Sequence, residues 1–234
     1  QYPYFLPNYI GRVLGLDPKT DTSAFRENMI RFLREYRPIY DSCNAVFDNT
    51  APLEKQLKEG LQRVHYYFPR YSLPASLITF IGPMDAIFTA SLSSYGDILT
   101  DNSLGCGLQL HLGAGFSFYH SPMGQALYPD YITRRFTPET ITVNAMKNII
   151  DDIYPEKSDL NALVDQMVEK GKRLYLLDLL MPKTADSLKI GYTSKQWEGC
   201  LANEGKIWNF FVTNNLLMNN SPDALQRFLN EGPQ

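Results

Sequence analysis

The sequence predicts a mainly helical α+β domain with a small central β-sheet. Apolar residues repeat at helical spacing before residue 70 and after residue 131, and short β-rich runs lie between them. With 234 residues, 44% of them hydrophobic, the chain can bury one sizeable core. Prolines and glycines among aromatic residues predict an extended segment over residues 1–20, and we expect one domain over residues 21–234.

Two helical regions are expected in the first third of the chain. One helix should start near Thr22 or Ser23 and be kinked or restarted at Pro38, because proline cannot donate the next hydrogen bond of the helix. Thr50 is a suitable N-cap for the next helix. Pro52 would then lie in the first turn of that helix, where a missing N–H costs nothing.

The middle of the chain predicts the sheet. The β-rich runs 77–81 and 86–90 are separated by Gly-Pro-Met-Asp at 82–85, which indicates a hairpin or two adjacent strands. Residues 107–113 alternate apolar with polar residues between glycines, as in a half-buried third strand. The stretch 95–106 is rich in Gly, Asp, Asn and Ser, so we expect it to be the most mobile loop.

Helices are expected from residue 138 onward. Pro138 can open a helix that runs to about Ile153, and Ser158 or Asp159 can cap a longer one that stops at Pro182.

A capping box at Thr193–Gln196 then starts a helix in which Trp197 and Trp208, eleven residues apart, would share one buried face. Cys200 lies on that face and is expected in the core, and Ser221 precedes a short last helix.

Composition and motifs exclude several classes of function. The net charge of −3 and the lack of a Lys/Arg-rich run make nucleic acid a poor partner, and no apolar stretch reaches the roughly 20 residues of a membrane span. The sequence has no P-loop, dinucleotide fingerprint or serine nucleophile elbow, so no cofactor is expected. A Cys43–Cys106 disulfide is possible, although no feature of the sequence supports it.

The histidines do not follow the pattern of a zinc peptidase. Of His65, His111 and His120, none is followed by Glu and no two are four residues apart, as the H-E-x-x-H motif requires. A three-histidine site assembled in space stays open as an alternative. A nucleophilic pair of Cys106 and His111 is disfavoured, because residues five apart on a strand point to opposite faces.

Three segments resemble the GldB-type gliding-motility lipoproteins of Bacteroidetes. These are "PLEKQLKEGLQRVHYYFPRYSLP" at 52–74, "GLQLHLG" at 107–113 followed by Tyr119, and "GKRLYLLDLLMPKTADSLKIGYTSKQWEGCLANEGKIW" at 171–208. The resemblance covers most of the chain from about residue 25 and is most specific in the last third.

The resemblance implies a lipoprotein of the cell envelope. Such proteins are expected on the periplasmic side of the outer membrane, tethered through an acylated cysteine that would lie upstream of Gln1. Some members are required for gliding and the associated type IX secretion, and no enzymatic activity is established for the family. Its similarity to predicted zinc proteases implies a zincin-like layout without the H-E-x-x-H site, because the helix at 139–153 carries no histidine.

The resemblance and the residue pattern together give a candidate cleft for an envelope protein or peptide partner. Its residues are expected to be His111, Tyr119, His120, Glu169, Lys172, Tyr175, Asp178 and Tyr192. The alternative interpretation of Lys172 and Asp178 is a structural role, in which they make hydrogen bonds that fix the helix and the following loop. The alternative to a binding protein is a hydrolase, metal-dependent or with a rebuilt site, that uses His111, His120 or Glu169.

Overall fold

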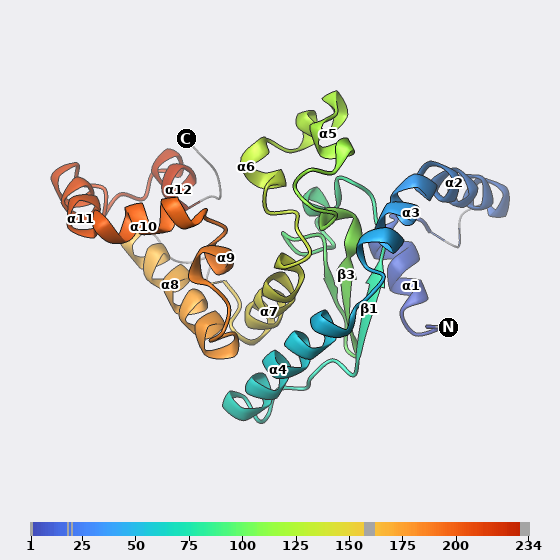
Figure 1. Cartoon of the computed structure of the whole chain (residues 1–234), viewed down its shortest axis with the longest axis horizontal. Helices are drawn as coiled ribbons and strands as arrows, with labels where there is room; N and C mark the ends of the chain where they lie inside the picture. Colours follow the sequence, from blue (N-terminus) through green and yellow to red (C-terminus); the bar gives the residue numbers. More distant parts are fainter. Residues whose placement is uncertain (1, 18, 20, 157–161, 230–234) are drawn as a thin grey trace.

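The computed structural model describes the whole chain except residues 1, 18, 20, 157–161 and 230–234 (Figure 1). It is mainly helical with one small sheet, as predicted. In chain order its elements are α1 (Leu6–Asn8), the π-helical turn η1 (Tyr9–Val13), α2 (Thr22–Glu35), α3 (Arg37–Val46), α4 (Ala51–Tyr67), β1 (Ser76–Phe80), η2 (Ala86–Phe88), β2 (Ile98–Leu99), β3 (Ser103–Gly107), η3 (Leu108–Leu110), η4 (Ser117–His120), α5 (Pro122–Leu127), α6 (Asp130–Thr133), α7 (Thr140–Ile153), α8 (Leu163–Leu180), α9 (Asp186–Ile190), α10 (Ser194–Ala202), α11 (Glu204–Thr213) and α12 (Pro222–Leu229).

The sheet has the strand order β1-β3-β2. β1 runs parallel to β3, and β2 runs antiparallel to it. One face of β3 presents Leu104 and Cys106 to the core that contains α7, whereas Ile78 and Phe80 of β1 pack on the other face with Phe5. The sheet therefore lies between α7 and α4 on one side and the N-terminal turn on the other (Figure 1).

Helix α7 is the centre of the core. It buries nine residues and contacts α4, α8, α9 and β3. Gly60 of α4 allows the close approach, because a Cβ at that position would lie 2.7 Å from the Met146 sulfur. Burial of Met146 and Ile149 alone contributes about 1.5–3 kcal/mol each.

The helical predictions were the most accurate. A new helix begins at Arg37, next to Pro38; α7 spans Thr140–Ile153; and α8 ends at Leu180, before Pro182. The capping box at Thr193 and the last helix after Ser221 are also confirmed. The predicted caps Ser158 and Asp159 lie outside the described residues.

Three predictions for the middle of the chain were wrong. Residues 86–90 form no strand, since η2 is a short 3-10 turn over Ala86–Phe88, and the third strand spans Ser103–Gly107 instead of 107–113. The stretch 95–106 is no loose loop, because it contains β2 and most of β3, and every residue of β3 is buried. Gly105 is needed there for packing, since a Cβ would lie 2.7 Å from the Phe5 ring.

The N-terminal segment was wrongly predicted as extended. Phe5 and Val13 are buried against the sheet by α1 and η1, and the Tyr9 hydroxyl donates to the Ile81 carbonyl at 2.7 Å. Thr50 occupies the N-cap position of α4, but its side chain does not cap; the Asn49 carboxamide accepts from the Ala51 N–H instead.

The predicted shared face of Trp197 and Trp208 was also wrong. The helix breaks at Asn203, so the two residues lie on α10 and α11, and Trp208 is 44% exposed. Cys200 is only partly buried, and Cys43 is free, as is Cys106. In the described part of the chain, no helix is both long and apolar enough to cross a membrane.

Candidate functional site

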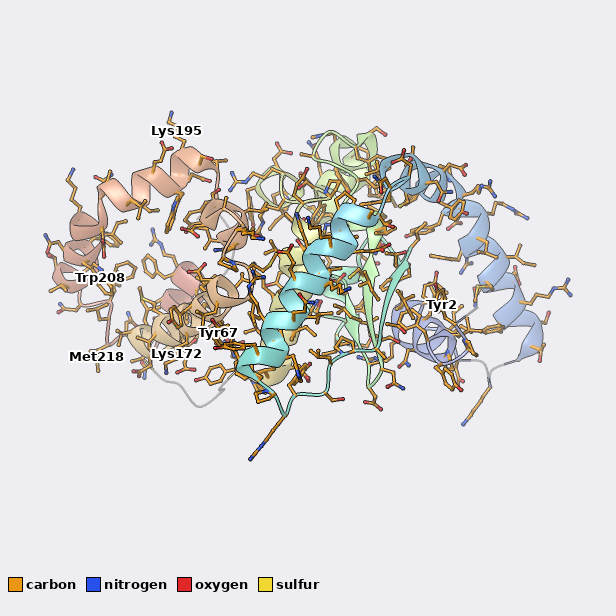
Figure 2. All side chains as sticks on the ribbon, turned by 60° about the horizontal axis from the view of Figure 1, so that its bottom comes forward. Tyr2, Tyr67, Lys172, Lys195, Trp208 and Met218 are labelled. Atoms are coloured by element: carbon orange, nitrogen blue, oxygen red, sulfur yellow. The ribbon has the colours of Figure 1, made fainter. Side chains whose placement is uncertain are left out.

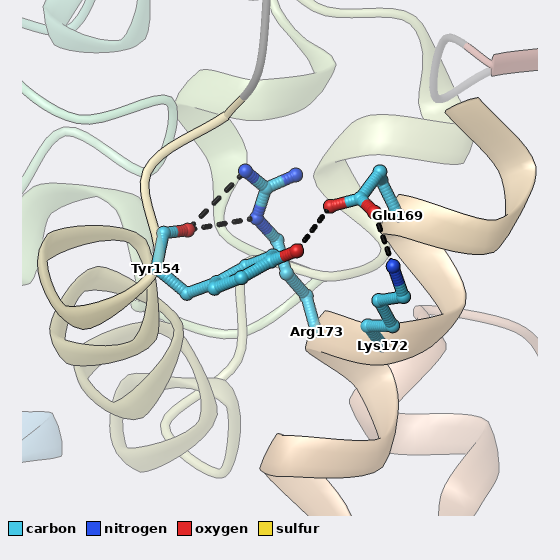
Figure 3. A network of polar contacts seen from close by, with 4 residues as sticks. All are labelled: Tyr154, Glu169, Lys172 and Arg173. Carbon is cyan, nitrogen blue, oxygen red and sulfur yellow. Dashed lines mark hydrogen bonds and ion pairs between the residues drawn. The ribbon is translucent and has the colours of Figure 1, made fainter. Parts of the chain in front are cut away.

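Four of the predicted site residues lie on α8, in the C-terminal arm, which we define as α8–α12 (163–229). Glu169 is buried, and the Tyr154 hydroxyl donates to one of its oxygens at 2.6 Å. The Lys172 ammonium donates to the other oxygen at 2.5 Å (Figure 3). Arg173 completes this network by donating to the Tyr154 carbonyl at 3.3 Å, so the end of α7 is tied to α8.

Each cation of this network pairs with at least one carboxylate. The hydrogen bond to Glu169 raises the pKa of Lys172, so the ammonium stays charged beside the carboxylate. Arg173 also lies 3.5 Å from Asp151 and 5.7 Å above the Tyr154 ring. The Glu169 carboxylate accepts two hydrogen bonds and is neutralised by a neighbouring cation, which makes it a poor base for water activation.

Asp178 belongs to a second network. The Lys189 ammonium is buried and donates to Asp178 at 2.5 Å and to Asp186 at 3.1 Å. Burial alone would lower the pKa of Lys189, but the two hydrogen bonds outweigh it and raise it. The network holds α9 against α8, which agrees with a structural role for Asp178 in fixing the helix and the following loop.

Tyr175 and Tyr192 are the two exposed tyrosines of the predicted site. Tyr175 on α8 is 64% exposed, and Tyr192 after α9 is 47% exposed. Gly191 allows the chain to turn between α9 and Tyr192, with φ at 75°. These two phenol rings are available for contact with a partner.

His111 is buried and lies outside the sheet, whereas the sequence predicted a half-buried strand over 107–113. It follows the short turn η3, and its Nδ1 lies 3.0 Å from the Thr140 hydroxyl and 3.2 Å from the Thr137 carbonyl. Its Nε2 has no hydrogen-bond partner among the described residues. Burial lowers the pKa of His111 to about 4, so the ring is neutral at pH 7.

Tyr119 and His120 lie on the turn η4. The buried Tyr119 hydroxyl donates to the Gln109 carbonyl at 2.7 Å and so holds the turns η3 and η4 together. His120 is exposed, and its Nε2 lies 2.8 Å from the Ala114 carbonyl.

The candidate acid and base groups of the hydrolase alternative therefore belong to three separate networks. Within the described residues, no group of three or more His, Cys, Asp or Glu side chains could hold a metal ion, so His111, His120 and Glu169 do not form one. The Cys106 thiol is a poor nucleophile, because burial and the nearby Asp97 raise its pKa.

Asp97 was missed by sequence reasoning, because it lies in the stretch interpreted as a mobile loop. It is completely buried and accepts from the Gly107 N–H at 3.0 Å and from the Asn148 amide at 3.1 Å. Burial raises the pKa of its carboxyl to about 7. Asp97 joins β3 to α7, and its distance from Asn148 in the sequence left no local signal.

The C-terminal arm exposes many large apolar side chains. The exposed residues are Val168, Leu174, Tyr175, Tyr192, Leu201, Ile207, Trp208, Phe210, Val212 and Met218. Figure 2 shows Trp208 and Met218 at the outer end of the arm, away from the sheet. Exposed apolar side chains that lie together in a patch often mark a contact surface.

Comparison with known proteins identifies one family. The family model described as "Gliding motility protein GldB" matches residues 1–234. No curated protein and no solved structure is detectably similar to the chain.

Proposed function

The chain belongs to the GldB gliding-motility lipoprotein family over residues 1–234, and on this premise we propose that it acts by binding a protein partner, without catalysis. The proposed location is the periplasmic side of the outer membrane, with a lipid anchor as the attachment. The partner would be an envelope protein or a peptide segment of one, bound by the C-terminal arm.

The apolar surface of the arm is the observation that carries this proposal. Tyr175, Trp208 and Val212 are 64%, 44% and 60% exposed and come from α8 and α11. Aromatic side chains that keep a large exposed area are typical anchors of protein interfaces. The internal hydrogen bonds of Glu169 and Asp178 give these residues a structural role, which supports binding over catalysis.

Site-specific photo-crosslinking tests the proposal in cells that make the lipidated protein. A photoreactive residue in place of Trp208 should yield one discrete crosslinked protein, and Val212→Glu should abolish that crosslink together with gliding. Lys195→Glu is the matched control, because Lys195 is an exposed residue of the same arm. If Val212→Glu leaves both crosslink and gliding intact, the arm is not the binding surface.

Metal analysis distinguishes binding from the hydrolase alternative. Protein purified without chelator should carry no stoichiometric zinc. Zinc at one equivalent that is lost in a His111→Ala or His120→Ala variant would favour the hydrolase.

A further inference from the structure

β1 leaves one edge of the sheet open. The Ser76 N–H donates to the Asn102 carbonyl at 3.1 Å, so Ser76 faces β3. Alternate residues of a strand direct their main-chain groups to opposite sides, which means that Leu77 and Thr79 point away from β3. Among the described residues, no group is hydrogen-bonded to the main chain of Leu77 or Thr79 on this outer side. Two N–H and two C=O groups are thus available to a further strand.

A groove lies directly beside this edge, between β1 and α4. Its volume is about 410 Å³, within the range of ligand-binding sites. The lining residues are Glu54, Leu57, Lys58, Leu61, Gln62, His65, Leu73 and Leu77. The leucines form an apolar floor, and the four other residues are exposed and follow one ridge of α4. Figure 1 shows α4 along the side of the sheet where β1 is the outermost strand.

The groove lies on the face of the sheet to which the side chains of Leu77 and Thr79 point. Leu77 and Thr79 pair with Leu104 and Cys106 of β3, whose side chains point into the core on the α7 and α4 side of the sheet. The side chains of a strand added outside β1, at the positions opposite Leu77 and Thr79, would therefore point into the groove.

We propose that an extended peptide segment of a partner protein binds here as a fourth strand, with apolar side chains at alternate positions in the groove. Main-chain hydrogen bonds to Leu77 and Thr79 would supply affinity, and the leucine floor would select the apolar side chains. A lipid chain could fill the floor but would leave four main-chain groups without partners. The rim carries both Glu54 and Lys58, so it does not favour an acidic or a basic peptide.

This groove is separate from the apolar surface of the C-terminal arm. The two sites are formed by different elements, so variants at Trp208 or Val212 should leave peptide binding at β1 unchanged. The proposed peptide site goes beyond the proposed function, and it can be disproved while the proposed function still holds.

Amide hydrogen exchange tests the proposal at single residues. In the free protein the Ile78 and Phe80 amides should exchange slowly, whereas those of Leu77 and Thr79 should exchange fast. The probe is a pool of soluble heptapeptides in which Leu, Ile, Val or Phe alternates with Thr. Bound peptide should protect Leu77 and Thr79 at least roughly tenfold.

A proline substitution removes one of the open donors without touching the β1–β3 ladder. Thr79→Pro should weaken peptide binding roughly tenfold, while Thr79→Ala, the matched control that keeps the N–H, should bind like the natural protein. If Thr79→Pro does not fold, peptides N-methylated at alternate amides replace it: one register should abolish binding to the natural protein and the other should not.

Three results would overturn the proposal. The first is a failure of the peptide tests: either no peptide of the pool binds at millimolar concentration, or both N-methylated registers bind equally. The second is that a dodecyl-chain detergent monomer occupies the groove and displaces the peptide without protecting Leu77 and Thr79. The third is protection that grows with protein concentration in the absence of peptide, which would identify a second copy of the chain as the occupant.

Discussion

Replacing Asp97 by asparagine should make the protein more stable at neutral and alkaline pH. Burial raises the pKa of the Asp97 carboxyl from 3.8 to about 7, although hydrogen bonds from the Gly107 N–H and the Asn148 amide act in the opposite direction. The unfolded chain therefore loses this proton at a lower pH than the folded protein. The carboxyl contributes stability below about pH 4, and this contribution is lost as the pH rises to about 7.

The size of the effect follows from the two pKa values. The difference between 3.8 and about 7 corresponds to ~4 kcal/mol at most. Asparagine has the same shape without the charge, and the Asn148 amide can turn to present its oxygen to the new NH2 group. We expect Asp97→Asn to raise the free energy of unfolding by roughly 2–4 kcal/mol at pH 8 and to change it little at pH 4.

Urea unfolding followed by circular dichroism at about pH 4, 6 and 8 measures this difference. Asp101→Asn is the matched control, because Asp101 is an exposed carboxylate in the turn between β2 and β3. The difference in unfolding free energy between the natural protein and Asp97→Asn should widen steadily with pH. A constant difference across the three pH values, or a variant that is less stable at pH 8, would refute the reasoning.

Three further predictions concern His111, Lys189 and Thr193. The His111 ring should stay neutral to about pH 4 in an NMR titration, and because the unfolded chain takes up that proton first, its burial costs stability as the pH falls below about 6.5; a midpoint above 6 would contradict this. Lys189→Met should lower the free energy of unfolding by about 1–3 kcal/mol in urea titrations, while Lys183→Met, which removes an exposed ion pair, should lower it by less than about 1 kcal/mol; equal losses would argue against a structural role for the buried ammonium. Thr193→Ala should cost about 1 kcal/mol in thermal unfolding, because Thr193 caps α10 and its hydroxyl accepts from the Gln196 N–H; Thr193→Ser should keep most of that stability, and an unchanged melting temperature for the alanine variant would contradict the cap.

The elements that sequence reasoning predicted are those with local signals. The start of α7 follows from Pro138, and the end of α8 follows from Pro182. The start of α10 follows from the reciprocal hydrogen bonds of Thr193 and Gln196. All of these depend on residues within one turn of each other. A capping pattern or a proline has the same local effect in any fold, so it can be recognised without the tertiary structure.

The first strand was predicted at 77–81 and is observed as β1 at Ser76–Phe80, whereas the other two predicted strands were misplaced because their sequences depend on distant contacts. Gly105 weakens the β propensity of β3, yet its missing side chain makes room for the Phe5 ring from the N-terminal turn, exactly one hundred residues earlier in the chain. Residues 86–90 have the composition of a strand but bury only part of their apolar surface in a 3-10 turn. Propensity alone could not distinguish these two segments.

The surroundings of the candidate-site residues could be predicted only in part. Tyr175 and Tyr192 are exposed, and Lys172 donates a hydrogen bond to Glu169 of the same helix, as expected for a structural role. The burial of His111 was not predicted because Thr137 and Thr140, which contact its ring, lie far along the chain, just before and at the start of α7. No periodic pattern in the sequence marks such a contact.

The attachment of the C-terminal arm determines how a mechanical load would travel through the molecule. α8 rests against α7 and α4, and the ion pair between Lys183 and Glu59 adds a link at 3.0 Å. A partner that pulls on the arm would first shear the packing between α8 and these two helices, and only then strain the strands behind them. Tension on the arm would thus be spread over a broad helical interface, and the sheet would be shielded from it.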